Sequence, residues 1–313
     1  MKPQTTELSF NPEHQASRRR ELYGLLGDLP PRSRQVSGKQ IAVESTSAYT
    51  LESLILDLNG EELVPAYFAL PRGHTSPCPV VLYNHAHGGD YTLGKDELRC
   101  SRKELMPKPY LDDLIEHGFA VLCIDHWLFG ERSGRDELDF CKEMLWRGRT
   151  PWGMMVYDSI KALDYLEMRP EIDSKRIGAL GLSMGSTMTW WLAALDGRIK
   201  AGADLCCLTD FDSLLAEDGL CEHSLYYYVP GLLKHFSTAD ICALAAPRAR
   251  LALAGSFDPL TPVAGLKRID EALSKLYAKA NYPDHWRLEI FPQGHQESQG
   301  MRDAAIGFLL RYL

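Results

Sequence analysis

The sequence lacks the features of a membrane-bound, exported or nucleic-acid-binding protein. None of its apolar runs reaches the ~18 residues that a membrane span needs, and residues 1–7 show no basic-then-apolar signal pattern. Basic residues are in the minority, with 34 Lys and Arg against 42 Asp and Glu, so the formal net charge is −8. A chain of this charge has no electrostatic footprint for nucleic acid and is not attracted to an anionic membrane surface. We therefore expect neither nucleic acid nor a membrane among its partners.

Cysteine pairs of the C-x-x-C type, internal repeats and low-complexity tracts are also absent. The eight cysteines form no C-x-x-C pair, and in a chain of 313 residues this usage fits reduced thiols. We therefore predict a cytoplasmic protein. A chain of this length with 45% hydrophobic residues can bury one large core without disulfides.

One short motif carries a specific chemical proposal. Residues 181–185 read G-x-S-x-G and lie between an apolar run at 176–182 and a helical pattern that begins at Met184. In this context a serine on a sharp strand-to-helix turn has an exposed hydroxyl and can act as a nucleophile. The two glycines leave room for the close approach of strand and helix. Ser183 is therefore the predicted nucleophile; the alternative is an ordinary junction in which it only caps the helix.

An acid and a histidine follow in the order that this architecture requires. Asp258 comes just after the strand candidate 248–254, and His295 comes just after the strand candidate 286–291. Catalytic groups collect at the carboxyl ends of strands in open α/β sheets, so we expect the two to meet Ser183. Histidine can take the serine proton near neutral pH, and a carboxylate fixes its tautomer. Asp210, after the apolar run 201–208, is the rival acid.

An oxyanion hole needs two backbone N–H groups. The first is predicted at Met184, directly after the nucleophile, and the second in the loop after the strand candidate 79–84, at His87 or otherwise at Gly88. His85 and His87 could instead chelate a metal, but no third ligand follows at a telling spacing. We expect no metal and no cofactor.

These segments, taken together, resemble a known family. The chain is similar to the α/β-hydrolases of the dienelactone hydrolase and acetyl-xylan-esterase-like group over about residues 65–313. The matching segments are residues 85–89, 118–125, 130–132, 158, 169–173, 176–185, 246–248, 255–258 and 294–295. Dienelactone hydrolases proper use cysteine where this chain has Ser183, and glucuronoyl esterases carry arginine where it has Met184. Both departures argue against those particular substrates.

The order of elements predicts an α/β-hydrolase fold: a mostly parallel central sheet with an N-terminal antiparallel hairpin at its edge and helices on both faces. The hairpin is expected at 48–58 and 63–70, with its turn at Asn59-Gly60. Residues 1–45 are predicted to form a helical extension with a helix at 12–26, and residues 46–313 the catalytic domain. Further helices are expected at 155–168 and from about 301, and insertions at about 126–152 and 210–241.

The two insertions are rich in aromatic residues and could line a substrate pocket, serve as packing, or form a contact between copies of the chain. The residues predicted for the pocket are His85, Gly88, Trp127, Arg132, Trp152 and Tyr227. Arg132 is most simply the partner of Glu131 in a structural ion pair, although its planar fork could bind a substrate carboxylate.

The predicted function is hydrolysis of a carboxylic ester of a small or medium substrate through a Ser-His-Asp acyl-enzyme mechanism. The alternatives are a short-peptide or amide hydrolase related to the catalytic domains of prolyl oligopeptidases, or a relative that binds ligand without turnover. The expected partner is a small-molecule ester, and a homodimer is plausible.

Overall fold

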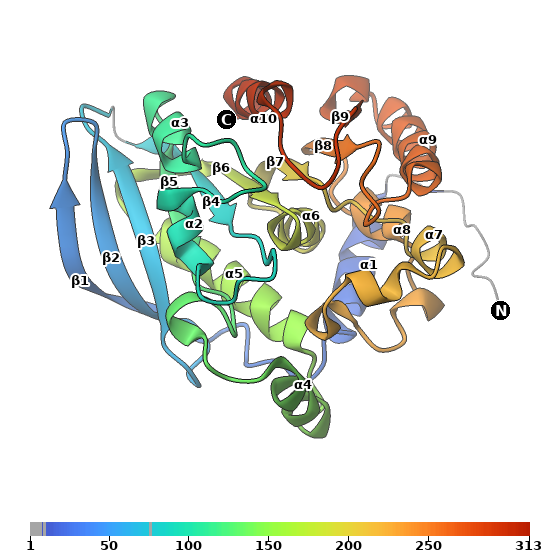
Figure 1. Cartoon of the computed structure of the whole chain (residues 1–313), viewed down its shortest axis with the longest axis horizontal. Coiled ribbons are helices and arrows are strands. Elements are labelled where there is room, and N and C mark those ends of the chain that lie inside the picture. The colour runs from blue at the N-terminus through green and yellow to red at the C-terminus, as the bar shows by residue number, and fades with distance from the viewer. Residues whose placement is uncertain (1–7, 9–10, 75–76) are drawn as a thin grey trace.

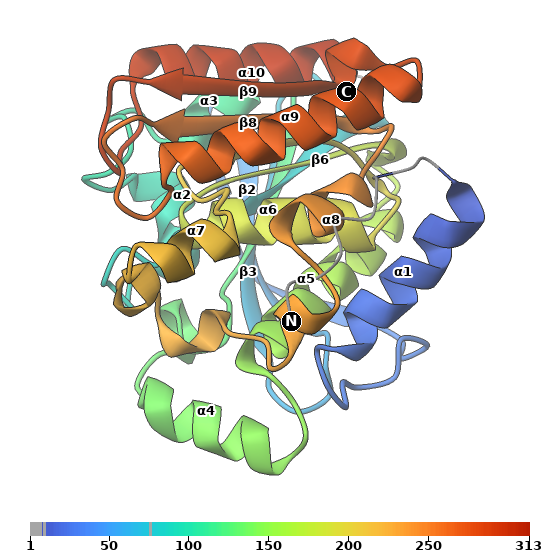
Figure 2. The same ribbon diagram turned by 90° about the vertical axis from the view of Figure 1, so that its right-hand side faces the viewer.

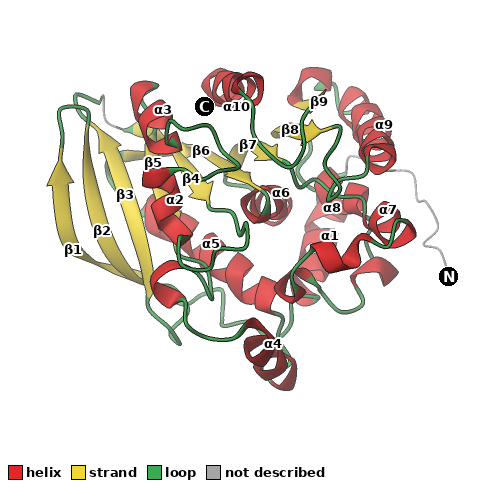
Figure 3. Cartoon of the chain, in the orientation of Figure 1, coloured by secondary structure: helices red, strands yellow, loops and turns green. Residues whose placement is uncertain are grey.

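The computed structural model describes residues 8, 11–74 and 77–313 and builds them around one mixed sheet (Figure 1, Figure 3). In this part of the chain the sheet has nine strands in the order β1-β2-β3-β5-β4-β6-β7-β8-β9. The pairs among β1, β2, β3 and β5 are antiparallel, and all pairs from β5–β4 to β8–β9 are parallel. This confirms the predicted fold class. The strands are β1 Ser37–Ser45, β2 Tyr49–Asp57, β3 Val64–Pro71, β4 Cys78–Asn84, β5 Ala120–Ile124, β6 Ile172–Leu182, β7 Ile199–Leu205, β8 Ala249–Gly255 and β9 Trp286–Phe291.

Helices cover both faces of the sheet and enclose a separate apolar core on each side. One face carries α5, α6 and α9 with α1 and α8 packed outside them, and the other carries α3 and α10 (Figure 1). The insertions add α4, which stands away from the sheet, and α7 (Figure 2). The helices are α1 Pro12–Gly24, α2 Glu97–Cys100, α3 Tyr110–Glu116, α4 Glu137–Trp146, α5 Pro151–Glu167, α6 Met184–Leu195, α7 Phe211–Ala216, α8 Thr238–Ala243, α9 Val263–Lys279 and α10 Gln299–Tyr312. Among the described residues, no helix combines the length and the apolar character needed to cross a membrane.

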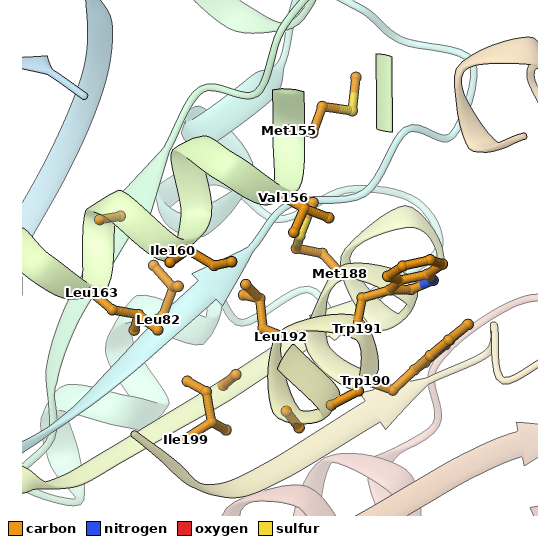
Figure 4. Packing of buried hydrophobic residues seen from close by; sticks show 14 of the residues in the cluster. Leu82, Met155, Val156, Ile160, Leu163, Met188, Trp190, Trp191, Leu192 and Ile199 are labelled. Carbon is orange, nitrogen blue, oxygen red and sulfur yellow. The ribbon is translucent and has the colours of Figure 1, made fainter. Parts of the chain in front are cut away.

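The larger core lies where α5 and α6 pack on the sheet, and its side chains face one another in Figure 4. Full burial of each such aliphatic or aromatic side chain contributes about 1.5–3 kcal/mol, so this contact fixes the helix that follows the motif serine. The labelled residues of the cluster are Leu82, Met155, Val156, Ile160, Leu163, Met188, Trp190, Trp191, Leu192 and Ile199.

Helix α5 begins four residues earlier than predicted, because its first turn is capped. Thr150 has an extended backbone, and its hydroxyl accepts a hydrogen bond from the amide of Gly153 at 2.9 Å. Pro151 occupies the first helical turn, where a missing N–H costs nothing. The apolar stripe begins only later, so periodicity alone placed the start too late.

The N-terminal segment differs from the prediction. Helix α1 is present, but Ser37–Ser45, within the expected helical extension, forms strand β1 along the outer side of β2. The predicted hairpin is therefore β2–β3 but does not form the edge of the sheet. Every residue of β1 is exposed, so the sequence lacks the alternation of a half-buried strand.

Candidate active site

Ser183 makes the whole turn between β6, which ends at Leu182, and α6, which begins at Met184. Its φ is +57°, a left-handed value that costs a residue with a side chain roughly 1–3 kcal/mol. A Cβ atom would come within 2.4 Å of the Asn84 carbonyl oxygen at Gly181, and within 1.9 Å of it at Gly185. The glycines therefore allow β4 and α6 to close around a strained serine. Its side chain makes no capping hydrogen bond.

The structure brings the three predicted residues into one hydrogen-bonded chain. His295 Nε2 lies 2.9 Å from Ser183 Oγ, and His295 Nδ1 lies 2.8 Å from Asp258 Oδ2. The other oxygen of Asp258 accepts the amide of Leu260 at 2.9 Å, which fixes the buried carboxylate. With the proton on Nδ1 held by Asp258, Nε2 presents a lone pair to the serine hydroxyl. This is the arrangement that a general base requires.

The rival acid lies elsewhere. Asp210 caps the N-terminus of α7: its Oδ1 accepts the amides of Asp212 and Ser213, and its Oδ2 pairs with Arg268. Among the residues that the structure describes, His295 is the histidine hydrogen-bonded to Ser183.

The loop after β4 holds the second predicted oxyanion donor, His87 or Gly88. The Ala86 amide donates to both carboxylate oxygens of Glu97 at 3.1 Å, so it is occupied. Within the described ranges, the His87 amide meets no protein acceptor, and the Met184 amide opens α6. Both groups are therefore available to a developing oxyanion. Gly88 has a φ of +52°, and a Cβ atom there would collide with the Arg102 guanidinium.

A buried ion pair that the sequence did not indicate fixes this loop. Besides the Ala86 amide, Glu97 accepts the Tyr83 hydroxyl at 2.7 Å and pairs with Arg102 at 2.8 Å. Arg102 also donates to the His87 carbonyl at 3.3 Å. Glu97 and Arg102 lie in a polar stretch with no motif, so only the buried contacts themselves identify them.

The rings of His85 and His87 have separate protein partners. His85 Nδ1 lies 3.0 Å from the Ala86 carbonyl oxygen, and its Nε2 accepts the backbone amide of His126 at 3.2 Å. His87 Nδ1 lies 3.2 Å from Ser224 Oγ. His85 therefore ties the loop after β4 to the end of β5, and no cluster of three or more His, Cys, Asp or Glu residues suited to a metal ion occurs in the described part of the chain.

Residues from both insertions form what we call the aromatic wall, in which successive ring centroids lie 4.8–6.3 Å apart. The wall consists, in spatial order, of Phe129, His87, Tyr226, Trp152, Tyr227 and His223. Two of the predicted pocket residues, Trp152 and Tyr227, therefore belong to this wall and are connected through Tyr226 to His87, the predicted donor. Trp127 lies outside the wall and stacks on Phe140 at 5.4 Å.

Arg132 does not pair with Glu131, contrary to the expectation from sequence. Its Nε bonds Glu62 at 2.6 Å and its Nη1 bonds Asp158 at 2.9 Å, whereas Glu131 pairs with Lys95. Two carboxylates bind its Nε and Nη1, and its Nη2 is buried, so the guanidinium does not present a free bidentate fork to a substrate carboxylate.

Acid is expected to destabilise the protein through His85. Burial lowers the pKa of this ring from 6.5 to about 4. Between these two pH values the histidine is therefore protonated in the unfolded chain and neutral in the folded protein. The stabilisation is complete above pH 6.5 and declines as the pH falls toward 4, by up to about 3 kcal/mol. Urea unfolding from about pH 7 to about pH 5 should show a shallower loss in His85→Gln than in the wild type. Equal losses would contradict this role.

The geometry and the fold define a class of protein. A serine on a strained turn after the parallel strand β6, with an acid after β8 and a histidine after β9, forms the site of an α/β-hydrolase. A solved structure named as a putative acetyl xylan esterase, from Bacteroides fragilis NCTC 9343, has a TM-score of 0.72 at 20% identity, over 92% of this chain and 77% of that one. A glucuronoyl esterase from Solibacter usitatus has a TM-score of 0.72 at 15% identity, over 98% of both chains.

The sequence comparisons identify the family. The model of the dienelactone hydrolase family matches residues 65–207. A Bacillus subtilis (strain 168) protein named "Putative hydrolase YtaP" is 45% identical over 298 residues, which is 95% of this chain and 99% of that protein. The chain belongs to the dienelactone hydrolase family, as the sequence resemblance predicted.

Proposed function

We propose that this protein hydrolyses carboxylic esters of small or medium substrates by acyl transfer through Ser183. The observation that carries the proposal is the unbroken chain of hydrogen bonds from Asp258 through His295 to Ser183. The family, and the names of the structural neighbours as esterases, support an ester rather than an unrelated substrate.

In the first half-reaction Ser183 Oγ attacks the ester carbonyl while His295 Nε2 takes its proton. The carbonyl oxygen becomes an oxyanion and is stabilised by the Met184 and His87 amides, each of which is expected to contribute roughly 2.7–4 kcal/mol. His295 then gives its proton to the departing alkoxide, which leaves an acyl group on Ser183. In the second half, water loses a proton to His295 as it attacks the acyl carbon. The bond to Ser183 Oγ then breaks, His295 returns the proton to Oγ, and the acid is released.

The test is turnover of p-nitrophenyl acetate, butyrate and octanoate, combined with covalent labelling by a fluorophosphonate. We expect ester hydrolysis, and a single label on Ser183 detected by peptide mass spectrometry. Ser186, one turn along α6 with a buried hydroxyl, supplies the matched control: Ser186→Ala should label and Ser183→Ala should not. Faster turnover of matched amides would instead favour a peptidase, and a folded protein that neither labels nor turns over would contradict the proposal.

A further inference from the structure

One segment of the second insertion spans the two sides of the candidate site. It lies between α7 and α8 and includes residues 223–227 (Figure 2). Ser224 Oγ lies 3.2 Å from Nδ1 of His87, the predicted oxyanion donor in the loop after β4. The Tyr226 amide donates to Glu137 of α4 at 2.9 Å, and the other Glu137 oxygen accepts the Tyr91 hydroxyl at 2.6 Å. These hydrogen bonds therefore hold the segment against the rest of the protein.

His223 begins this segment, and its ring is hydrogen-bonded to the backbone of Leu260. Its ring stacks on Tyr227 with centroids 4.8 Å apart and planes 16° apart. Burial lowers the pKa of His223, the neighbouring Leu260 backbone opposes that change, and the charge of His295 lowers it further. Leu260 is the residue whose amide holds Asp258. The ring therefore lies next to the residue that holds Asp258, the acid bonded to His295, and its lowered pKa favours the neutral form.

One nitrogen of this ring has no use in the protein itself. Among the described residues His223 Nε2 finds no hydrogen-bond partner, although the atom is buried. A buried polar atom without a partner is destabilising, so a ligand group that forms a hydrogen bond to it is favoured over one that does not. Stacking on Tyr227 fixes the plane of the ring, so the direction of this nitrogen is set before a ligand arrives.

Resting on the proposed function, we propose that His223 Nε2 accepts a hydrogen bond from a hydroxyl group on the alcohol portion of the ester. The reason is the side on which it lies: His295 protonates the departing alkoxide, so the alcohol portion must lie next to His295. Preferred substrates are then esters of alcohols that carry a second hydroxyl close to the ester oxygen, because Nε2 of the neutral ring accepts a hydrogen bond and only a hydroxyl can donate one. The family model ends at residue 207 and assigns nothing to His223.

A matched pair of substrates isolates this contact. 2-Hydroxyethyl acetate and n-propyl acetate have nearly the same size and differ by a terminal hydroxyl in place of a methyl group. We expect the wild type to prefer the hydroxyethyl ester. His223→Phe keeps a ring against Tyr227 but removes the nitrogen, and should reduce that preference about fivefold to tenfold, mainly through KM for the hydroxyethyl ester.

Two further variants separate recognition from structure. His223→Gln retains a hydrogen-bonding group and should recover part of the preference, which a purely structural role would not predict. His235→Phe makes the same change at an exposed histidine of the same insertion and should leave both esters unaffected. A wild type without preference for the hydroxyethyl ester, or an equal fall for both esters in His223→Phe, overturns the role of His223 while p-nitrophenyl acetate still turns over. Loss of all ester turnover in the wild type would instead overturn the proposed function.

Discussion

Replacement of Ser183 by alanine is expected to lower kcat for p-nitrophenyl acetate by on the order of 10⁵-fold or more. The expectation rests on the removal of the attacking atom, because His295 then has no proton to accept and no acyl-enzyme can form. The fold should survive. Alanine keeps the Cβ atom of serine, so the strain of the positive φ is unchanged, and the lost hydroxyl makes no capping contact with α6.

Thermal unfolding is the necessary companion measurement, since a low rate in an unfolded protein says nothing about mechanism. The melting temperature of Ser183→Ala should lie within a few degrees of the wild type, as expected for a change of less than about 1 kcal/mol. Turnover close to that of the wild type in a folded variant would exclude Ser183 as the nucleophile.

The three residues of the hydrogen-bonded chain were predictable because each has a local signal in the sequence. Ser183 directly follows a run of residues with a strand pattern, and Asp258 and His295 lie in the short loops after two further runs. Parallel strands that share a sheet bring such positions to one edge. Their prediction did not require knowledge of any contact between distant residues. The sequence also placed β2, β3 and β9 well, because their turn residues and alternation are local signals.

Features that depend on contacts between distant residues were not predictable. Arg132 had an acidic neighbour in sequence, yet its partners Glu62 and Asp158 lie 70 and 26 positions away. Glu97 gives no local sign that its carboxylate will reach the Ala86 amide in the loop after β4. Strand β1 was not predicted for a different reason: it buries neither face, so its sequence has no alternation of apolar and polar residues to detect.

Asp258→Asn is expected to lower kcat by roughly 10⁴-fold with little change in KM. The cause is the tautomer of the histidine. An asparagine N–H directed at His295 Nδ1 makes that nitrogen an acceptor, so the ring proton moves to Nε2. The nitrogen that faces Ser183 Oγ at 2.9 Å then carries a hydrogen and can no longer take the serine proton.

The rival acid provides a matched control, because the sequence alone left two aspartates after strand candidates. Asp210→Asn keeps the cap on α7, since asparagine and aspartate are equally good at that position, and it should leave kcat and stability near those of the wild type. The two variants make the same chemical change, so a difference in their kcat is due to the position of the aspartate and not to the loss of a charge as such. If Asp210→Asn lost activity while Asp258→Asn kept it, the acid would have to be reassigned and the contact at 2.8 Å between Asp258 and His295 would be merely structural.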